Sequence, residues 1–196
     1  MTAYLALCLL FLAITVKSDP TRCDAPSMEA LVVEVDYMFR YSFVTNLSYD
    51  AQNNTLSKRF VSAKAYKRGT IQNRRYDLLY FHENETLQAF RLDLDTKHCS
   101  TKEISKEPRP LFGIPEHAKF GGESIHRDSG MYRESGILVN KWWANTERSH
   151  YIGFWTQDCL PVYETYEYTR IVYSYVELGI WDPNVFVPPL EKCFFP

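Results

Sequence analysis

The sequence of 196 residues lacks the short motifs that mark most metal and nucleotide sites. It has no CxxC, CxxH, HxH or HExxH spacing, which argues against a zinc site, and no glycine-rich loop that could hold a phosphate. It also lacks an excess of basic residues, because 22 Lys and Arg stand against 24 Asp and Glu. A formal charge of −2 argues against a nucleic-acid partner, since nucleic-acid-binding domains usually present a basic face.

Long apolar runs are scarce, and the longest one stands at the start of the chain. Residues 4–16 are apolar, but this run is shorter than the ~20 residues that cross a bilayer. Val16 and Ser18 suit the −3 and −1 positions of a signal-peptidase site, so we expect residues 1–18 to be a signal peptide rather than a buried helix. Residues 19–196 would then form one exported, extracellular domain without a transmembrane segment.

Cysteines and glycosylation sequons agree with export. An even number of cysteines in the exported part favours two disulfides over metal ligation, and spacing alone does not choose among the three pairings that four cysteines allow. Three N-x-S/T sequons, all in stretches that resemble turns, are expected glycosylation sites. The cysteines are Cys23, Cys99, Cys159 and Cys193, and the sequon asparagines are Asn46, Asn53 and Asn84.

Strand patterns dominate the exported part. Residues 31–43 alternate in polarity, which predicts one long strand with the odd-numbered side chains buried and with Glu34 and Asp36 on a wet face. Two apolar stretches flank residues 82–85, "HENE", as a hairpin would, and the second half is rich in Tyr, Trp, Val and Ile. We expect a mostly antiparallel β protein of roughly eight to eleven strands.

Other segments fit strands less well. Residues 27–34 and 100–107 could each hold one helical turn, which gives one or two short helices in all. Residues 108–136 are rich in Pro, Gly and charge and predict a long connection with room for a short strand. The prolines of residues 182–193, "DPNVFVPPLEKC", oppose a helix and predict an extended strap. Its apolar side chains, expected to pack across a sheet, are Val185, Phe186 and Val187.

The sequence has few groups of residues that resemble a catalytic site. Ser124, His126 and Asp128 lie close together, but a hydrolase elbow requires G-x-S-x-G on a strand-to-helix turn, and this segment lacks the second glycine. Triad members also converge more often from distant parts of a chain than from neighbours. We therefore expect a polar surface loop here and no enzymatic activity, with a secreted hydrolase as a distant alternative.

Aromatic side chains are the most prominent feature, at 15% of the chain. Tyrosines are frequent in residues 163–175 at both odd and even positions, so both faces of a strand there would carry aromatic side chains that must be covered by other parts of a structure or by a ligand. An ordinary β-sandwich core, a cup for a large apolar molecule and an isologous dimer interface each provide one.

The chain resembles the ependymin family in a series of short motifs. They are "CDAP" at 23–26, "RRYDLLYF" at 74–81, "DTKHC" before and including Cys99, "DCLPV" around Cys159 and, most specific, "DPNVFVPPLEKC" at 182–193. The resemblance implies two antiparallel sheets curled into a half-open barrel or sandwich around a hydrophobic pocket, similar to bacterial lipoprotein carriers of the LolA type. It also implies glycosylation, a homodimer or a dimer with a related chain, and an association with lipid and calcium. The implied disulfides are Cys23–Cys159 and Cys99–Cys193.

Our leading hypothesis is a secreted protein that binds a long apolar or amphipathic molecule. Fatty acids, phospholipids or glycolipids, and isoprenoids such as carotenoids would suit an aromatic-lined pocket. The alternative is a calcium-dependent adhesion or matrix protein without a small ligand. Bound Ca²⁺ is compatible with either, although the sequence does not place its ligands, and no catalytic cofactor is expected. The candidate lining residues are Tyr37, Phe39, Tyr41, Phe43, Phe90, Leu92, Trp142, Phe154 and Trp155.

Overall fold

The computed structural model describes residues 23–38, 40–65, 75–83, 86–105, 112–126, 136–145 and 150–193, and the expected signal peptide lies outside them. The described part is built from strands, and its helical segments are two 3₁₀ turns, neither with the length and apolar character of a membrane-spanning helix. The elements are β1 Met28–Asp36, β2 Tyr41–Asp50, β3 Thr55–Ala65, β4 Tyr76–Glu83, β5 Thr86–Asp93, β6 Cys99–Ser105, β7 Lys119–His126, β8 Ile137–Asn145, β9 His150–Thr156, β10 Pro161–Tyr166, β11 Thr169–Leu178, η1 Pro183–Phe186 and η2 Leu190–Lys192.

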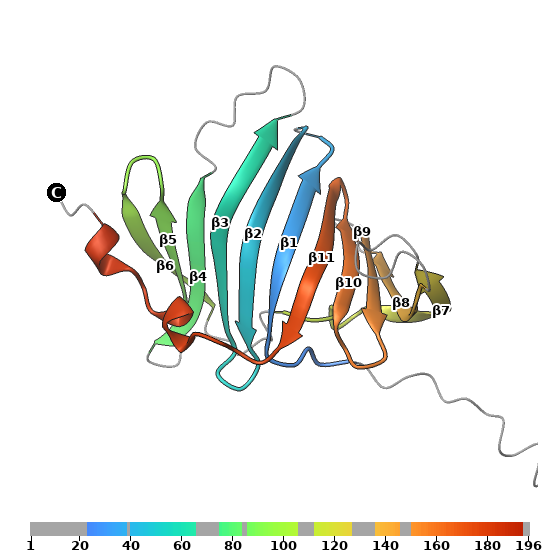
Figure 1. Cartoon of the computed structure of the whole chain (residues 1–196). Helices are drawn as coiled ribbons and strands as arrows, with labels where there is room; N and C mark the ends of the chain where they lie inside the picture. Colours follow the sequence, from blue (N-terminus) through green and yellow to red (C-terminus); the bar gives the residue numbers. More distant parts are fainter. Residues whose placement is uncertain are drawn as a thin grey trace, which may run out of the picture.

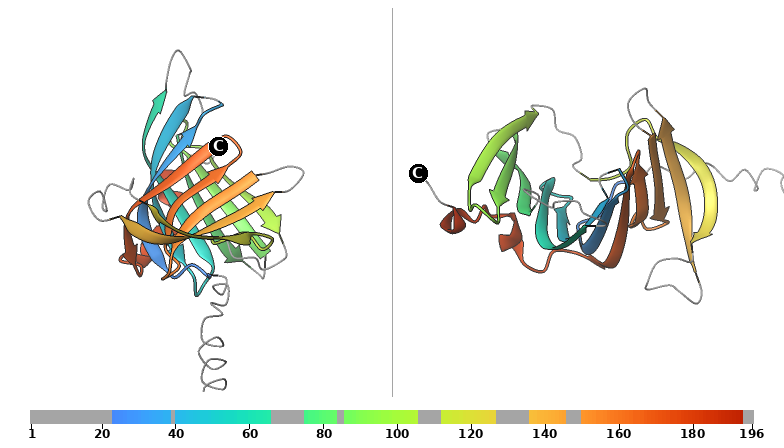
Figure 2. Two further views of the ribbon diagram at one scale, coloured as in Figure 1. Left: turned by 90° about the vertical axis from the view of Figure 1, so that its right-hand side faces the viewer. Right: turned by 90° about the horizontal axis from the view of Figure 1, so that it is seen from above.

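The strands form one sheet, which corrects the expectation of two. Its order is β6-β5-β4-β3-β2-β1-β11-β10-β9-β8-β7, and every neighbouring pair is antiparallel (Figure 1). The reason is the pairing of β1 with β11 from Met28↔Leu178 to Asp36↔Thr169, which joins the two halves of the chain edge to edge. Figure 2 shows the sheet curved into a trough, with β4–β6 as one wall and β7–β9 as the other.

The predicted long strand over 31–43 is wrong, because the chain turns between β1 and β2. Arg40 takes a left-handed backbone conformation with φ 57°, and β2 returns beside β1 with Tyr41 opposite Asp36. The odd-numbered residues stay apolar from Leu31 to Phe43, but those of β1 face outward and those of β2 face inward. Glu34 and Asp36, expected on a wet face, therefore lie on the inner face of the trough.

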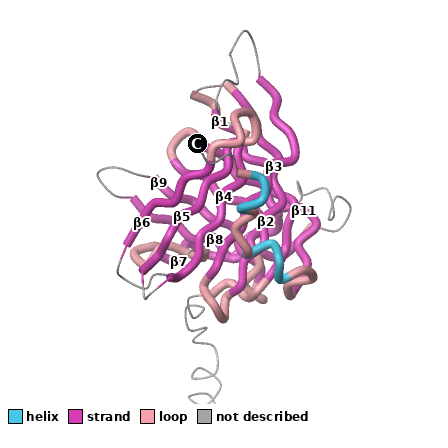
Figure 3. Tube along the Cα trace, turned by 90° about the vertical axis from the view of Figure 1, so that its left-hand side faces the viewer, coloured by secondary structure: helices cyan, strands magenta, loops and turns pink. Residues whose placement is uncertain are grey.

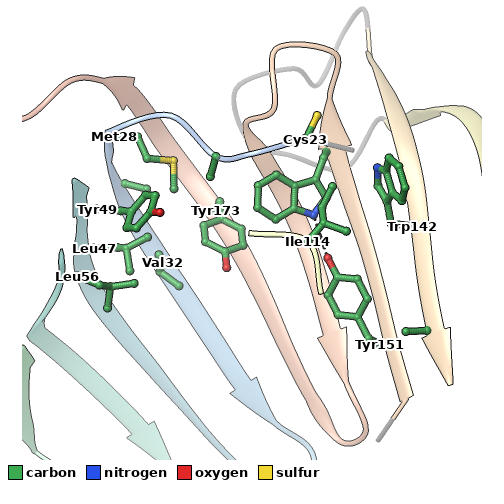
Figure 4. Close-up of a cluster of buried hydrophobic side chains, with 14 residues drawn as sticks. Cys23, Met28, Val32, Leu47, Tyr49, Leu56, Ile114, Trp142, Tyr151 and Tyr173 are labelled. Atoms are coloured by element: carbon green, nitrogen blue, oxygen red, sulfur yellow. Dashed lines mark hydrogen bonds between the residues drawn. The ribbon is translucent and has the colours of Figure 1, made fainter. Parts of the chain in front are cut away.

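The main core fills one end of the trough (Figure 4). Met28, Val32 and Leu47 are at most 3% exposed on its floor, and Trp155 of β9 is fully buried on the wall. The Cys23–Cys159 disulfide ties the segment before β1 to the turn after β9. This end is therefore a packed core made by both halves of the chain, while the other end of the trough is open.

The C-terminal strap crosses the outer face of the sheet (Figures 1 and 3). It is not extended throughout: η1 begins after Asp182, whose side chain caps the turn by accepting from Asn184 N at 3.0 Å, and Pro183 suits the first helical position. Phe186 packs on a small cluster of Leu79, Phe90 and Leu92, while Val187 is 58% exposed. The Cys99–Cys193 disulfide fastens the end of the strap to β6, as the family resemblance implies.

Candidate functional site

The open end of the trough holds a pocket of about 480 Å³, a volume typical of small-molecule sites. It lies on the inner face, because its lining side chains share the strand parity of the core residues Val32, Leu47 and Leu56. The lining comes from β1 to β5 and consists of Glu34, Tyr41, Phe43, Thr45, Lys58, Phe60, Tyr76, Leu78, Tyr80 and Arg91.

Half of this lining is aromatic. The rings of Tyr41 and Phe43 stand 4.5 Å apart between centroids, and the Tyr41 hydroxyl donates to Asp36 Oδ2 at 3.0 Å. On the facing wall Tyr80 is partly buried and packs against the core cluster, and burial raises its pKa. The Tyr41 ring, held through its hydroxyl, offers a ligand an apolar surface that is already ordered.

Charged side chains share the pocket with these rings. Lys58 and Arg91 bring positive charge and Glu34 brings one negative charge, so the lining is cationic by one unit. The Arg91 guanidinium lies over the Tyr76 ring at 4.3 Å, an arrangement that orients the guanidinium. The pocket is thus amphipathic, whereas the sequence and the resemblance led us to expect a hydrophobic one.

A buried carboxylate lies farther along the inner face of the trough. Glu164 of β10 is 2% exposed and accepts from Tyr173 at 2.6 Å and from Tyr151 at 2.9 Å. Trp155 Nε1 donates to the Tyr151 hydroxyl at 3.0 Å, which extends the network along β9. Burial raises the pKa of Glu164, and the tyrosine hydroxyls and the charge of Lys58 oppose that rise.

The same network perturbs its tyrosines. Burial and then the Glu164 charge raise the pKa values of Tyr151, Tyr166 and Tyr173 well above their ordinary value. These hydroxyls therefore stay protonated and act as permanent donors to Glu164. The network joins β9, β10 and β11, which follow β1 in the sheet on the side away from β2 to β5.

The sequence-predicted lining residues fall into separate places. Tyr41 and Phe43 line the pocket, whereas Tyr37 lies in the β1–β2 turn and is 57% exposed, and Phe39 is outside the described residues. Trp142 and Trp155 belong to the filled end of the trough. The others lie on the outer face: Phe90 and Leu92 under the strap, and Phe154 in a ring stack with Tyr163 and His126.

Residues that the sequence analysis missed make up most of the pocket. Tyr76, Leu78 and Tyr80 share one parity of the hairpin strand that the sequence did predict, so their common face was a usable signal. Among the charged members, Glu34 and Arg91 alternate with apolar neighbours and Lys58 lies between Ser57 and Arg59, so all three resemble solvent-facing residues in the sequence. Only the curvature of the sheet turns that face inward.

Other predicted sites are placed as follows. Asn46 is exposed in β2, which corrects its assignment to a turn, Asn53 is exposed in the β2–β3 turn, and Asn84 is outside the described residues. Ser124 and His126 lie on the edge strand β7, and Asp128 is outside the described part. Among the described residues, no three His, Cys, Asp or Glu side chains gather in a group that could hold a metal ion.

The fold and the pocket define a β protein whose single sheet curls into a trough, filled at one end and open to an amphipathic pocket at the other. The family model described as Ependymin matches residues 70–193, and the chain belongs to the ependymin family. Family membership and the two disulfides fit an extracellular protein.

Individual relatives agree with this assignment. Mammalian ependymin-related protein 1 of Mus musculus is 36% identical over 109 residues, which cover 51% of this chain and 46% of the relative. Its counterpart in Rattus norvegicus is 35% identical over the same shares, so the match spans a little less than half the length of these relatives. An uncharacterized conserved protein of Thermus thermophilus has a similar fold, with a TM-score of 0.57 at 7% identity, covering 86% of this chain and 89% of its own.

Proposed function

We propose that the protein is an extracellular binding protein, not an enzyme, that carries a long amphipathic molecule in the trough pocket. The observation that carries this proposal is the mixed lining of the pocket, where five aromatic rings share one cavity with Lys58 and Arg91. A ligand with an apolar body and an anionic head would match both parts. Fatty acids and phospholipids fit this description better than a carotenoid hydrocarbon, which would cover both cations without offering them an acceptor.

The head would sit against Lys58 and Arg91, and the apolar body would lie against the aromatic rings that share the pocket with them. Burying a hydrocarbon chain against such rings contributes roughly 25 cal/mol per Å² of apolar surface removed from water. A charge-assisted hydrogen bond to one cation adds roughly 1.5–3 kcal/mol. Both contributions are needed, because the apolar term favours binding of any chain while the charged term fixes its direction.

Titration with a dansyl-labelled fatty acid tests this proposal. We expect saturable binding at one site, and Lys58→Met should weaken it roughly tenfold to hundredfold, the worth of one charge-assisted hydrogen bond. Lys102→Met is the matched control, because Lys102 is exposed on β6 and lies outside the pocket lining. Equal affinity of wild type and Lys58→Met would refute the placement of the head, and absence of saturable binding would refute the function.

Exposed apolar residues favour a second role in protein–protein contact. Tyr175, Leu178 and Trp181, at the end of β11 and just beyond it, are 65%, 63% and 74% exposed. Tyr175 also takes φ 51° at an irregularity in the β1–β11 register, which costs backbone energy and persists because neighbouring pairs fix it. Such a patch suits a dimer or an adhesive partner. Sedimentation of wild type and Trp181→Ala should show a larger species that the variant loses; a monomer at all concentrations would argue against a dimer.

A further inference from the structure

Residues 112–118, which precede β7, belong to the connection between the two opposite edges of the sheet, because β6 and β7 are consecutive in the chain. The described part of this connection, residues 112–118, packs against the inner face, where Ile114 is 4% exposed (Figure 4). The filled end of the trough is thus filled partly by a segment that belongs to no strand.

Phe112 occupies a cage of three aromatic rings. Its centroid lies 5.4 Å from Tyr49, 5.6 Å from Trp155 and 5.7 Å from Tyr173, which come from three different strands. The ring is only partly buried, although it packs against the main core. Gly113, directly after it, has φ 141°, a conformation that other residues rarely adopt.

The polar groups of the cage have partners other than Phe112. Tyr173 donates to Glu164 and Trp155 donates to Tyr151, so these bonds persist whether or not a phenyl ring lies between the rings. Replacing Phe112 with another apolar group would therefore leave neither of these two donors unsatisfied. The cage thus accommodates an apolar group of about the size of a benzyl side chain.

The cage lies next to the pocket along the inner face of β2 and β3, separated from it by one row of core residues. Thr45 and Lys58 line the pocket, and the next inward-facing residues along their strands, Leu47 and Leu56, belong to the core cluster. Tyr80 belongs to both, since it lines the pocket and packs against the cluster. A chain that runs from the pocket along β2 and β3 reaches Tyr49, and with it the cage.

We propose that the cage of Tyr49, Trp155 and Tyr173 is the distal part of the ligand site, and that Phe112 is an internal occupant which the tail of a long amphipath displaces. This inference rests on the proposed function. Short ligands fill the open pocket alone and leave Phe112 in place. Longer ones remove a phenyl ring from its cage, which is unfavourable, and offset that loss by burying their own terminal carbons there.

Competition of saturated fatty acids of increasing length against the dansyl-labelled fatty acid tests the proposal. Phe112→Ala should leave the affinity for eight-carbon acids unchanged and raise the affinity for eighteen-carbon acids roughly tenfold to hundredfold, the worth of burying a phenylalanine ring. Phe112→Leu, which keeps most of the volume, should give an intermediate increase. Phe120→Ala is the matched control, because Phe120 is also partly buried but packs on Trp142, away from the cage.

Every outcome of this competition experiment either supports or overturns the proposal. If affinity rises with acid length in Phe112→Ala and in Phe112→Leu but not in Phe120→Ala, the result supports Phe112 as an occupant that the ligand displaces. Identical length profiles in wild type and both Phe112 variants, or an equal gain at every length, overturn it while the proposed function stands. If no acid of any length competes in any protein, the proposed function itself fails and this inference falls with it.

Discussion

Removal of the Cys99–Cys193 disulfide tests how the strap holds the outer face of the sheet. The bond closes a loop with a sequence separation of 94. In the chain-entropy model a loop of this length restricts the unfolded chain by about 4–5 kcal/mol. We therefore expect the double substitution of Cys99 and Cys193 by Ala to lower the free energy of unfolding by about 4–5 kcal/mol, with a further loss where Phe186 leaves Leu79 and Phe90.

Urea unfolding followed by tryptophan fluorescence measures this loss, with the slope of the transition checked for a change in compactness. The matched control removes Cys23–Cys159, whose sequence separation is 136. Loop length alone makes the two losses differ by only about 0.3 kcal/mol, because the entropy depends on the logarithm of the length. A loss below about 1 kcal/mol for Cys99–Cys193 would refute the strap as a stabilising clasp.

Three further substitutions probe the inner face and the sequons. Burial raises the pKa of Glu164, so the folded protein binds the Glu164 proton more tightly than the unfolded chain does. Protonation of Glu164 therefore stabilises the fold. This stabilisation is fully present below the ordinary pKa of 4.5 and is lost as the pH rises through the raised pKa. The stability of wild type relative to Glu164→Gln should therefore increase as the pH falls from neutral toward 4.5, and parallel curves in thermal melts would contradict the burial. Gly153→Ala places a Cβ against the Tyr151 hydroxyl and 2.8 Å from Trp155 Nε1, which should cost roughly 1–3 kcal/mol in urea unfolding; an unchanged midpoint would show that the pair moves freely. Asn46→Gln should remove one glycan from protein secreted by animal cells, read as a mass difference, and an unchanged mass would mean that this strand position is not modified.

Much of the strand content could be predicted from the sequence, because local alternation survives in the fold. The hairpin around residues 82–85 became β4 and β5, and the Tyr- and Trp-rich second half became β8 to β11. The connection over 108–136 contains the short strand β7. Recognition of the ependymin motifs was confirmed, and the disulfide pairing that it implied is the one the structure shows.

The rest depended on contacts between distant segments. The turn between β1 and β2 is hard to recognise in the sequence, because the odd-numbered residues stay apolar from Leu31 to Phe43 and only Met38 interrupts the polar positions near it, while the buried face changes. The pairing of β1 with β11 decides between one sheet and two, and nothing local in either strand encodes it. The charged members of the pocket, such as Lys58, look like solvent-facing residues until the curvature of the sheet turns them inward.

The predicted lining residues lie in separate parts of the sheet for the same reason. Trp142 and Trp155 have large apolar surfaces and are buried in the packed end of the trough, where Phe112 packs on Trp155 and Phe120 packs on Trp142. A binding pocket instead contains apolar side chains that the protein itself buries only in part, such as Phe43. High hydrophobicity alone therefore predicts core residues better than it predicts pocket-lining residues.

The most direct test of the central claim is native mass spectrometry of the protein purified, without detergent, from cells that secrete it. We predict a species heavier than the glycosylated chain by one amphipathic molecule with an acidic head, and loss of most of that species when Lys58 and Arg91 are both replaced by Met. A mass that equals the glycosylated chain alone, in wild type as in the double variant, would contradict the account.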